Sequence, residues 1–335
     1  MAFPKFVALI GILVSTFIGP VKEAAAQPST LTAFYTAPVV SMAPMWIAKE
    51  AGFFKKQGLD VRLVFIASGP LGTTSILSGD VDVGIIGGFA PTRAISGGAK
   101  NLVMIGQSKN RMTGAIVGRK EIASVQELKG KRLGIDRVGS NPDMFTQAAL
   151  NRFQMDPLKD LQYIQLGSIG QGIPALKAGT IDALTTSTPH DLFAQRLGYK
   201  VILDITAMKI PFAATVLLSA RNTVERKQAD LHKFMRAYAE AVHYYLTNRE
   251  GTAQIVAKYT KVDDRDVVAH AIESEAAAME RTLQVDPKGI ELILALIGKS
   301  MPQTTSVKTD EFYDPRFTNE MRDSGFLKKL WGDKL

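Results

Sequence analysis

The sequence predicts an α/β protein with largely parallel sheets, arranged as two lobes of similar plan. Short apolar segments alternate with amphipathic helical segments through most of the chain. A weak internal repeat recurs after about 100 residues, and a long helical stretch follows near the C-terminal end. Alternating strands and helices are typical of α/β units, because parallel strands need a crossover connection that is usually a helix.

The first part of the chain is predicted to alternate regularly between strand and helix. The expected strands are Leu31–Tyr35, Val61–Ile66, Val81–Ile86 and Leu102–Gln107; the expected helices are Pro44–Phe54, Thr73–Ser78 and one that opens over Pro91–Ile95. Gly58 and Gly79 follow two of the helices, where a left-handed residue ends the turn. These elements predict a first sheet.

A second sheet is predicted from the middle of the chain. Its expected elements include strands Thr113–Gly118 and Arg132–Asp136 and a helix Ser140–Phe153, capped by Asn141 with Pro142 in the first turn. A further strand is expected at Thr215–Ser219. From Val224 to about Ser300 the pattern is helical, with apolar residues at i, i+3, i+4 and i+7.

The repeat joins these observations into a domain plan. Leu77–Asp82 and Leu176–Asp182 each contain Gly-x-x-Asp between a helix and a strand, with a proline at the next helix. We therefore expect residues 31–110 and 214–335 to form lobe 1 and residues 111–213 to form lobe 2. The crossing segments Asn110–Thr113 and Pro211–Ala214 would form a two-segment hinge.

Residues 1–26 are predicted to be a signal peptide. Lys5 precedes an apolar run from Phe6 to Ile18, and Ala24–Ala26 offers a small-residue cleavage site. The alternative is an uncleaved membrane anchor, although the run is short for a transmembrane helix. Cleavage after Ala26 would place the mature protein in the periplasm, where we expect a monomer.

Composition excludes several classes of protein. The chain of 335 residues contains no cysteine, which excludes disulfides, thiolate metal sites and a cysteine nucleophile. Cleavage would remove two of the 40 basic and one of the 32 acidic residues and leave 309 residues with a net charge of +7. The basic residues are scattered among acidic ones, which argues against a nucleic-acid partner.

Five polar loops are expected at the carboxyl ends of the strands, where open α/β sheets bind ligands. They are Thr36–Pro44, Ser68–Thr74, Gly87–Pro91, Arg137–Asn141 and Ser187–His190. The alternative for any one of them is an ordinary turn. The candidate ligand-binding residues in and beside these loops are Tyr35, Ser41, Met42, Gly69, Gly88, Phe89, Arg111, Arg137, Ser140, Asn141, Thr188 and His190.

Arg111 and Arg137 are the charged candidates in this set. A guanidinium matches the oxygens of a carboxylate, sulfonate or nitrate, so the ligand is expected to carry an acidic or strongly polar head. The alternative is that each arginine is solvated or forms a structural ion pair. Tyr35, Phe89 and His190 could pack against a ligand, or could belong to the core.

Enzyme signatures are absent from the sequence. There is no G-x-S-x-G elbow, P-loop, H-E-x-x-H or G-x-G-x-x-G motif after the first strand. The four histidines do not stand at metal-ligand spacing. We therefore expect no catalytic residues, no metal site and no cofactor.

Several segments resemble the periplasmic solute-binding proteins of nitrate/sulfonate/taurine-type ABC importers. They are Ala43–Phe54, Gly58–Val61, Leu77–Gly84, Leu128–Gly134 and Phe317–Phe326. The resemblance covers nearly all of the mature chain. It implies the type II periplasmic-binding-protein fold, a small anionic or polar organic solute in the cleft between the lobes, and docking onto a membrane permease.

The resemblance leaves the ligand open, since relatives take inorganic anions, sulfonates, aromatic acids or pyrimidine-type compounds. Phe89 stands where small residues are usual, which favours a ligand with an apolar portion. A second function also remains open, because a related branch resembles pyrimidine-precursor synthases of thiamine biosynthesis. A secretion signal and the lack of a histidine cluster argue against that enzyme.

Overall fold

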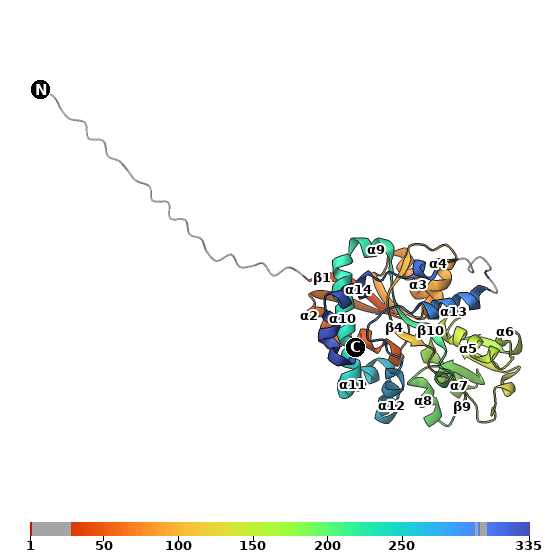
Figure 1. Cartoon of the computed structure of the whole chain (residues 1–335). Helices are drawn as coiled ribbons and strands as arrows, with labels where there is room; N and C mark the ends of the chain where they lie inside the picture. The colour runs from red at the N-terminus through yellow and green to blue at the C-terminus, as the bar shows by residue number, and fades with distance from the viewer. Residues whose placement is uncertain (2–27, 299–300, 302–306) are drawn as a thin grey trace.

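The computed structural model describes residues 1, 28–298, 301 and 307–335 and confirms the α/β fold (Figure 1). Two five-stranded sheets are flanked by helices. The expected signal peptide lies outside the described residues. Within the described part of the chain, no helix has the length and apolar character needed to cross a bilayer.

The first sheet has the strand order β2-β1-β3-β10-β4. Its strands are β1 (Ser29–Tyr35), β2 (Leu59–Phe65), β3 (Val83–Ile86), β4 (Leu102–Arg111) and β10 (Pro211–Ala220). Strand β1 is parallel to β2 and β3, whereas β10 is antiparallel to β3 and β4. The parallel strands therefore end at one edge, where their following loops gather.

The second sheet repeats this plan with the order β7-β6-β8-β5-β9. Its strands are β5 (Ala115–Gly118), β6 (Arg132–Ile135), β7 (Gln162–Gln165), β8 (Ala183–Thr186) and β9 (Lys200–Asp204). Strand β6 is parallel to β7 and β8, and β5 is antiparallel to β8 and β9. In each sheet, one strand (β1 or β6) thus pairs in parallel with two neighbours. One of those neighbours (β3 or β8) also pairs with an antiparallel strand (β10 or β5).

The Gly-x-x-Asp repeat has the same structural role in each sheet. The Asp82 carboxylate accepts a hydrogen bond from the backbone N–H of Thr32 at 2.8 Å, and Asp182 accepts one from that of Arg132 at 3.0 Å. Both donors lie in the strand that pairs parallel with two neighbours. Gly79 and Gly179 end the preceding helices at φ of 82° and 72°, a left-handed conformation that favours glycine.

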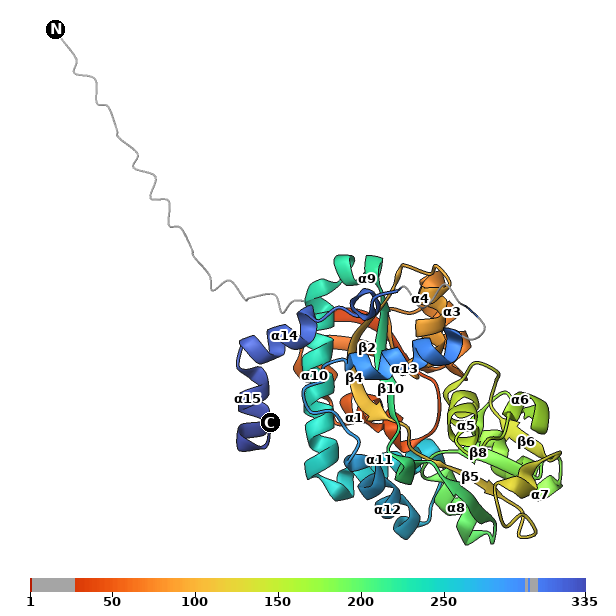
Figure 2. The same cartoon turned by 45° about the vertical axis from the view of Figure 1, so that its right-hand side comes forward.

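Two strands carry the chain between the sheets (Figure 2). Strand β4 ends at Arg111, and the chain enters β5 at Ala115. Strand β10 begins at Pro211, which pairs with Arg111, and runs unbroken to Ala220. The crossing segments are thus largely extensions of paired strands, with irregular register between Pro211 and Thr215. We propose that the two sheets define the two lobes, called lobe 1 (first sheet) and lobe 2 (second sheet) below.

Helices cover the faces of both sheets. Those associated with lobe 2 are α5 (Asn141–Asn151), α6 (Pro157–Asp160), α7 (Gly172–Ala178) and α8 (His190–Arg196). Those of lobe 1 are α1 (Ala43–Glu50), α2 (Phe53–Lys56), α3 (Gly69–Ser78), α4 (Phe89–Ser96), α9 (Arg221–Arg226), α10 (Gln228–Thr247), α11 (Arg249–Thr260), α12 (Arg265–Ala276), α13 (Pro287–Gly298), α14 (Arg316–Asp323) and α15 (Phe326–Trp331).

Two local predictions differ from the structure. The helix expected over Pro44–Phe54 is divided into α1 and α2, because Gly52 adopts φ of 78°. The cap expected at Asn141 is Ser140, whose hydroxyl accepts a hydrogen bond from the Asp143 N–H. Asn141 is instead the first residue of α5, which frees its side chain for other contacts.

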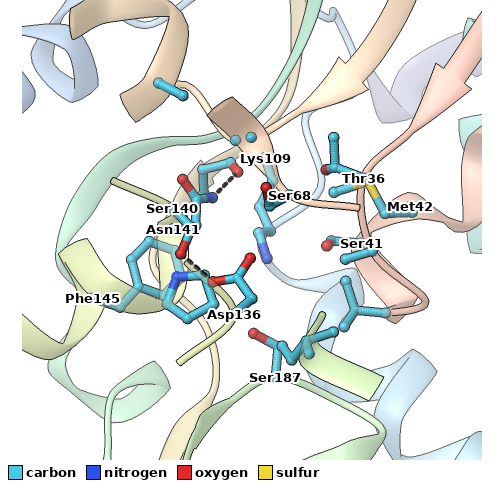
Figure 3. Close-up of a pocket in the computed structure, with 18 residues that line it drawn as sticks. Thr36, Ser41, Met42, Ser68, Lys109, Asp136, Ser140, Asn141, Phe145 and Ser187 are labelled. Carbon is cyan, nitrogen blue, oxygen red and sulfur yellow. Dashed lines mark hydrogen bonds between the residues drawn. The ribbon is translucent and has the colours of Figure 1, made fainter. Parts of the chain in front are cut away.

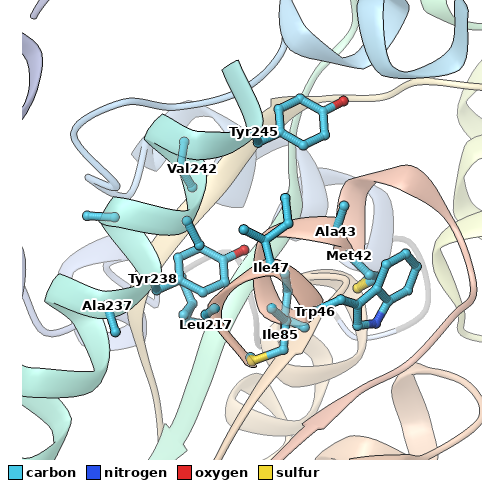
Figure 4. Close-up of a cluster of buried hydrophobic side chains, with 14 of the residues drawn as sticks. Met42, Ala43, Trp46, Ile47, Ile85, Leu217, Ala237, Tyr238, Val242 and Tyr245 are labelled. Carbon is cyan, nitrogen blue, oxygen red and sulfur yellow. The ribbon is translucent and has the colours of Figure 1, made fainter. Parts of the chain in front are cut away.

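The largest core cluster joins the first sheet to α1 and α10 (Figure 4). Ile47 of α1 lies toward Tyr238 of α10, and these two side chains and that of Trp46 are fully buried. Trp46 also stacks on Tyr259 with ring centroids 4.7 Å apart. This packing holds α1, and with it the loop that follows β1, firmly on lobe 1.

Candidate functional site

A cavity of about 50 Å³, lined by both polar and apolar residues, lies between the two sheets (Figure 3). Such a volume is several times the space of one water-sized probe, so the cavity can hold a small solute. Its lining residues are Thr36, Ala37, Val39, Ser41, Met42, Ser68, Gly69, Gly87, Ala90, Lys109, Asp136, Ser140, Asn141, Pro142, Phe145, Ile169, Ser187 and Ala214.

All five loops expected at the strand ends contribute to this lining. Residues of lobe 1 come from the loops after β1, β2 and β3, and residues of lobe 2 come from the loops after β6 and β8. Five of the candidate residues line the cavity, namely Ser41, Met42, Gly69, Ser140 and Asn141.

Both candidate arginines lie outside the lining. The Arg111 guanidinium donates to the carbonyl of Ala277. Arg137 is the second residue after β6, is half-buried, and has a buried Nε without a hydrogen-bond partner. A position near a strand end therefore does not bring either guanidinium into the cavity. After β6 it is Asp136, the residue before Arg137, that lines the cavity.

The other candidates pack around the cavity or in the core. Tyr35 contacts Trp46 and Phe65 on lobe 1, with ring centroids 5.5 and 5.3 Å away, and Phe89 is a buried core residue. Gly88 lies against β10, where its N–H donates to the Ala213 carbonyl at 2.9 Å. None of these three residues is part of the cavity lining.

Thr188 and His190 join the two lobes. The carbonyl of Thr188 accepts from the N–H of Val40 at 3.0 Å, and His190 Nε2 donates to the Pro38 carbonyl at 2.9 Å. Burial lowers the pKa of His190 and so favours the neutral ring, although the hydrogen bond to the Pro38 carbonyl acts in the opposite direction. Both residues thus fix the loop after β1 against lobe 2.

Among the described residues, Lys109 is the only basic residue that lines the cavity, and the sequence pattern did not single it out. Its Nζ donates to Thr113 Oγ1 at 2.6 Å and to Glu275 Oε2 at 3.1 Å. The Lys109 and Glu275 side chains are 3% and 1% exposed. Glu275 of α12 also accepts from Thr113 and from Thr188 Oγ1. The ion pair therefore connects lobe 1, the crossing segment and lobe 2.

Asp136 is the acidic residue of the lining and follows β6 directly. Its carboxylate accepts from the Ser140 hydroxyl. Burial raises its pKa to about 6, and the nearby Asp143 adds to the effect, although the hydrogen bonds of Ser140 and backbone N–H groups oppose it. No basic side chain of the described residues forms an ion pair with Asp136.

Replacement of Asp136 by Asn should stabilise the ligand-free protein in a pH-dependent way. The carboxyl pKa is about 6 in the folded state, against the ordinary aspartate value of 3.8 in the unfolded chain. Above about pH 4 the carboxyl group loses its proton in the unfolded chain but keeps it in the folded protein. The folded wild-type protein therefore loses stability as pH rises, and this loss levels off once the pH is above about 6, where the folded protein is also ionised. The stabilisation by Asp136→Asn should therefore increase by about 2 kcal/mol between pH 4.5 and 8.

Urea unfolding of both proteins at several pH values measures this difference. Asp191, whose pKa burial raises to about 7, also titrates in this window, but its contribution is common to both proteins and cancels. A stability difference that does not change with pH would contradict the assignment.

Asn141 reaches from lobe 2 to the crossing strand β10. Its Nδ2 donates to the carbonyl of Ala214 at 2.7 Å, which leaves Oδ1 buried without a partner. A Cβ on Gly87 of lobe 1 would lie 2.2 Å from this Oδ1. Only glycine at position 87 therefore permits the close approach of the two lobes at this point.

The family comparison places the chain among known proteins. The model of the family described as NMT1/THI5 like matches residues 40–251, and the chain belongs to this family. YtlA of Bacillus subtilis, named as a binding protein, is 25% identical over 299 residues, which cover 85% of this chain and 89% of YtlA. A binding protein of Brucella abortus is 26% identical over 247 residues, 72% of this chain and 75% of that protein.

Solved structures confirm the periplasmic-binding-protein fold. The alkanesulfonate-binding protein SsuA of Xanthomonas axonopodis, bound to MOPS, has a TM-score of 0.71 and 18% identity, with 85% of this chain and 96% of SsuA covered. The nitrate-binding protein NrtA of Synechocystis has a TM-score of 0.73 and 16% identity, with 91% and 90% covered. Both neighbours are described as binding proteins.

Proposed function

We propose that this protein is an extracytoplasmic solute-binding protein that delivers a small polar organic solute to an ABC importer. The observation that carries the proposal is the cavity between the two sheets, to which both lobes contribute polar and apolar residues. Ligand-binding proteins of this fold hold a solute between lobes that close by a hinge motion. The family membership and the binding-protein names of the relatives support the same conclusion.

The proposed mechanism follows from the contacts at the cavity. A solute that contacts Ser68 of lobe 1 and Asn141 of lobe 2 stabilises the closed arrangement, because its contacts with both lobes exist together only when they are close. The interlobe bonds of Val40 and His190 add to this closure. The closed form would then dock as a monomer onto the membrane permease, after export and cleavage near Ala26.

The synthase alternative gains no support at the cavity. Its lining, within the described residues, contains no histidine, and His190 is committed to the Pro38 carbonyl. Lys109 is paired with Glu275, so its amine is held as a charged donor rather than as a free nucleophile. We therefore propose binding and release without chemical conversion.

A thermal-shift screen of the mature protein tests the proposal. The panel contains nitrate, sulfonates, carboxylates, pyrimidines and small amides and amidines. A solute at about 100 times its Kd should stabilise the native state by about 2.7 kcal/mol and raise Tm by roughly 5 °C. The Asn141→Leu variant should lose most of the shift. A shift that persists unchanged in this variant would place binding outside the cavity and contradict the proposal.

A further inference from the structure

The lobe 2 side of the cavity presents hydrogen-bond acceptors whose capacity the described residues do not fully use. Asp136 is 8% exposed, and its protein contacts satisfy only part of its capacity, since a carboxylate can accept about four hydrogen bonds. The amide of Asn141 is oriented by its donor bond to Ala214, so the remaining Oδ1 is an acceptor. Both residues line the cavity: Asp136 opens the loop between β6 and α5, and Asn141 is the first residue of α5.

The lobe 1 side presents donors. Two of the three N–H bonds of Lys109 are used by Thr113 and Glu275, which leaves one. The Ser68 hydroxyl is buried without a partner. Figure 3 shows the Lys109 amine and the Asp136 carboxylate directed toward the same space. The two sides of the cavity thus have opposite hydrogen-bonding character.

The charges at this site disfavour a simple anion. Glu275 neutralises Lys109 at 3.1 Å, whereas Asp136 has no cationic partner within the described residues. A buried carboxylate without a counter-ion is costly, and a second negative charge beside it raises that cost. A donor group on the ligand would instead supply the missing partner of Asp136.

We propose that the solute carries an N–H donor group that binds Asp136 and Asn141, and an acceptor group that binds Lys109 and Ser68. This inference rests on the proposed function and specifies the chemistry of the ligand. The fitting class is a small neutral or zwitterionic molecule, or a cation with a forked donor such as an amidinium. A bare inorganic anion lacks the required donor.

Acetamidinium and acetate test this polarity, because both have four heavy atoms in the same planar shape but opposite hydrogen-bonding character. Binding is measured by NMR titration up to about 50 mM, a range suited to fragments with millimolar Kd. The buffer is at pH 8, where Asp136 is ionised. The wild-type protein should bind acetamidinium at least about tenfold more tightly than acetate, since only the donor forms charge-assisted hydrogen bonds with Asp136.

Two variants locate the effect. Asp136→Asn should weaken acetamidinium binding by about tenfold or more and should not weaken acetate binding. Asn141→Leu should also weaken acetamidinium binding. Asp191→Asn is the matched control, because Asp191 is buried with a raised pKa but does not line the cavity; its acetamidinium affinity should equal that of the wild type.

The opposite results would overturn the inference. They are acetate binding as tightly as acetamidinium in the wild type, loss of affinity in Asp191→Asn equal to that in Asp136→Asn, or no binding of either probe. If the probes fail while sulfonates or nitrate bind in the wider screen and Asn141→Leu abolishes that binding, the proposed function stands and only the polarity of the ligand is wrong.

Discussion

Lys109→Met should lower the free energy of unfolding by about 3–5 kcal/mol, because removal of one partner leaves the other charge buried and unpaired. The Glu275 carboxylate would keep hydrogen bonds from Thr113 and Thr188 but would lose its only ion-pair partner among the described residues. The same change removes a donor from the cavity. Denaturant unfolding at pH 7 and solute binding measure the two effects separately.

Two further variants test the cause. The double variant Lys109→Met with Glu275→Gln should recover most of the lost stability, since no uncompensated charge remains. Lys56→Met is the surface control: Lys56 pairs with Glu240, but its side chain is 63% exposed, so a change of about 0–1 kcal/mol is expected. Equal losses of unfolding free energy in Lys109→Met and Lys56→Met would contradict the prediction that an unpaired buried charge causes the larger loss.

Gly88→Ala should destabilise the protein by about 3 kcal/mol, at the upper end of the usual cost of overpacking. A Cβ at this position would lie 2.4 Å from the backbone oxygen of Ala213. This oxygen belongs to the crossing strand β10 and accepts the Gly88 N–H. Gly289 approaches the same residue, with a Cβ position 2.5 Å from the Ala213 nitrogen. The strand is therefore held between two glycines and cannot easily move aside.

Gly170→Ala provides the matched control. No atom outside its chain neighbours lies closer than 3.8 Å to the Cβ position, and Gly170 does not have a positive φ. This change should alter stability by less than about 1 kcal/mol, in the stabilising direction if the unfolded chain loses freedom. If urea unfolding shows a smaller loss of stability for Gly88→Ala than for Gly170→Ala, the loop before α4 relaxes freely around the added methyl group. That result would contradict the prediction.

Much of the fold followed from local patterns in the sequence. The strand–helix alternation predicted the strands of the first sheet, because parallel strands and their crossover helices leave a strong periodic signal. In the second sheet it predicted β5 and β6 but not the edge strands β7 and β9, which are partly exposed and therefore lack a strong apolar pattern. The repeated aspartates Asp82 and Asp182 were visible as Gly-x-x-Asp, and the structure explains them as acceptors for equivalent strands. The five polar loops were predictable because carboxyl ends of parallel strands meet at one edge.

The chemistry of the cavity was harder to predict. Arg137 and Asp136 are adjacent, and a rule about strand ends cannot say which of the two points into the cavity, since side chains of neighbouring residues diverge. Lys109 is an unusual charge near the end of a buried strand, but its partner Glu275 is 166 residues away and left no local signal. Ser68 was included in a predicted loop without a specific role.

Hydrogen–deuterium exchange, measured with and without the best solute from the screen, tests most directly whether the solute binds between the lobes. Slower exchange on binding is expected in loops of both lobes together, namely Thr36–Pro44, Ser68–Thr74, Gly87–Pro91, Arg137–Asn141 and Ser187–His190. Protection confined to one lobe, or found only at a site away from the cavity such as α15, would contradict a solute held in the interlobe cavity.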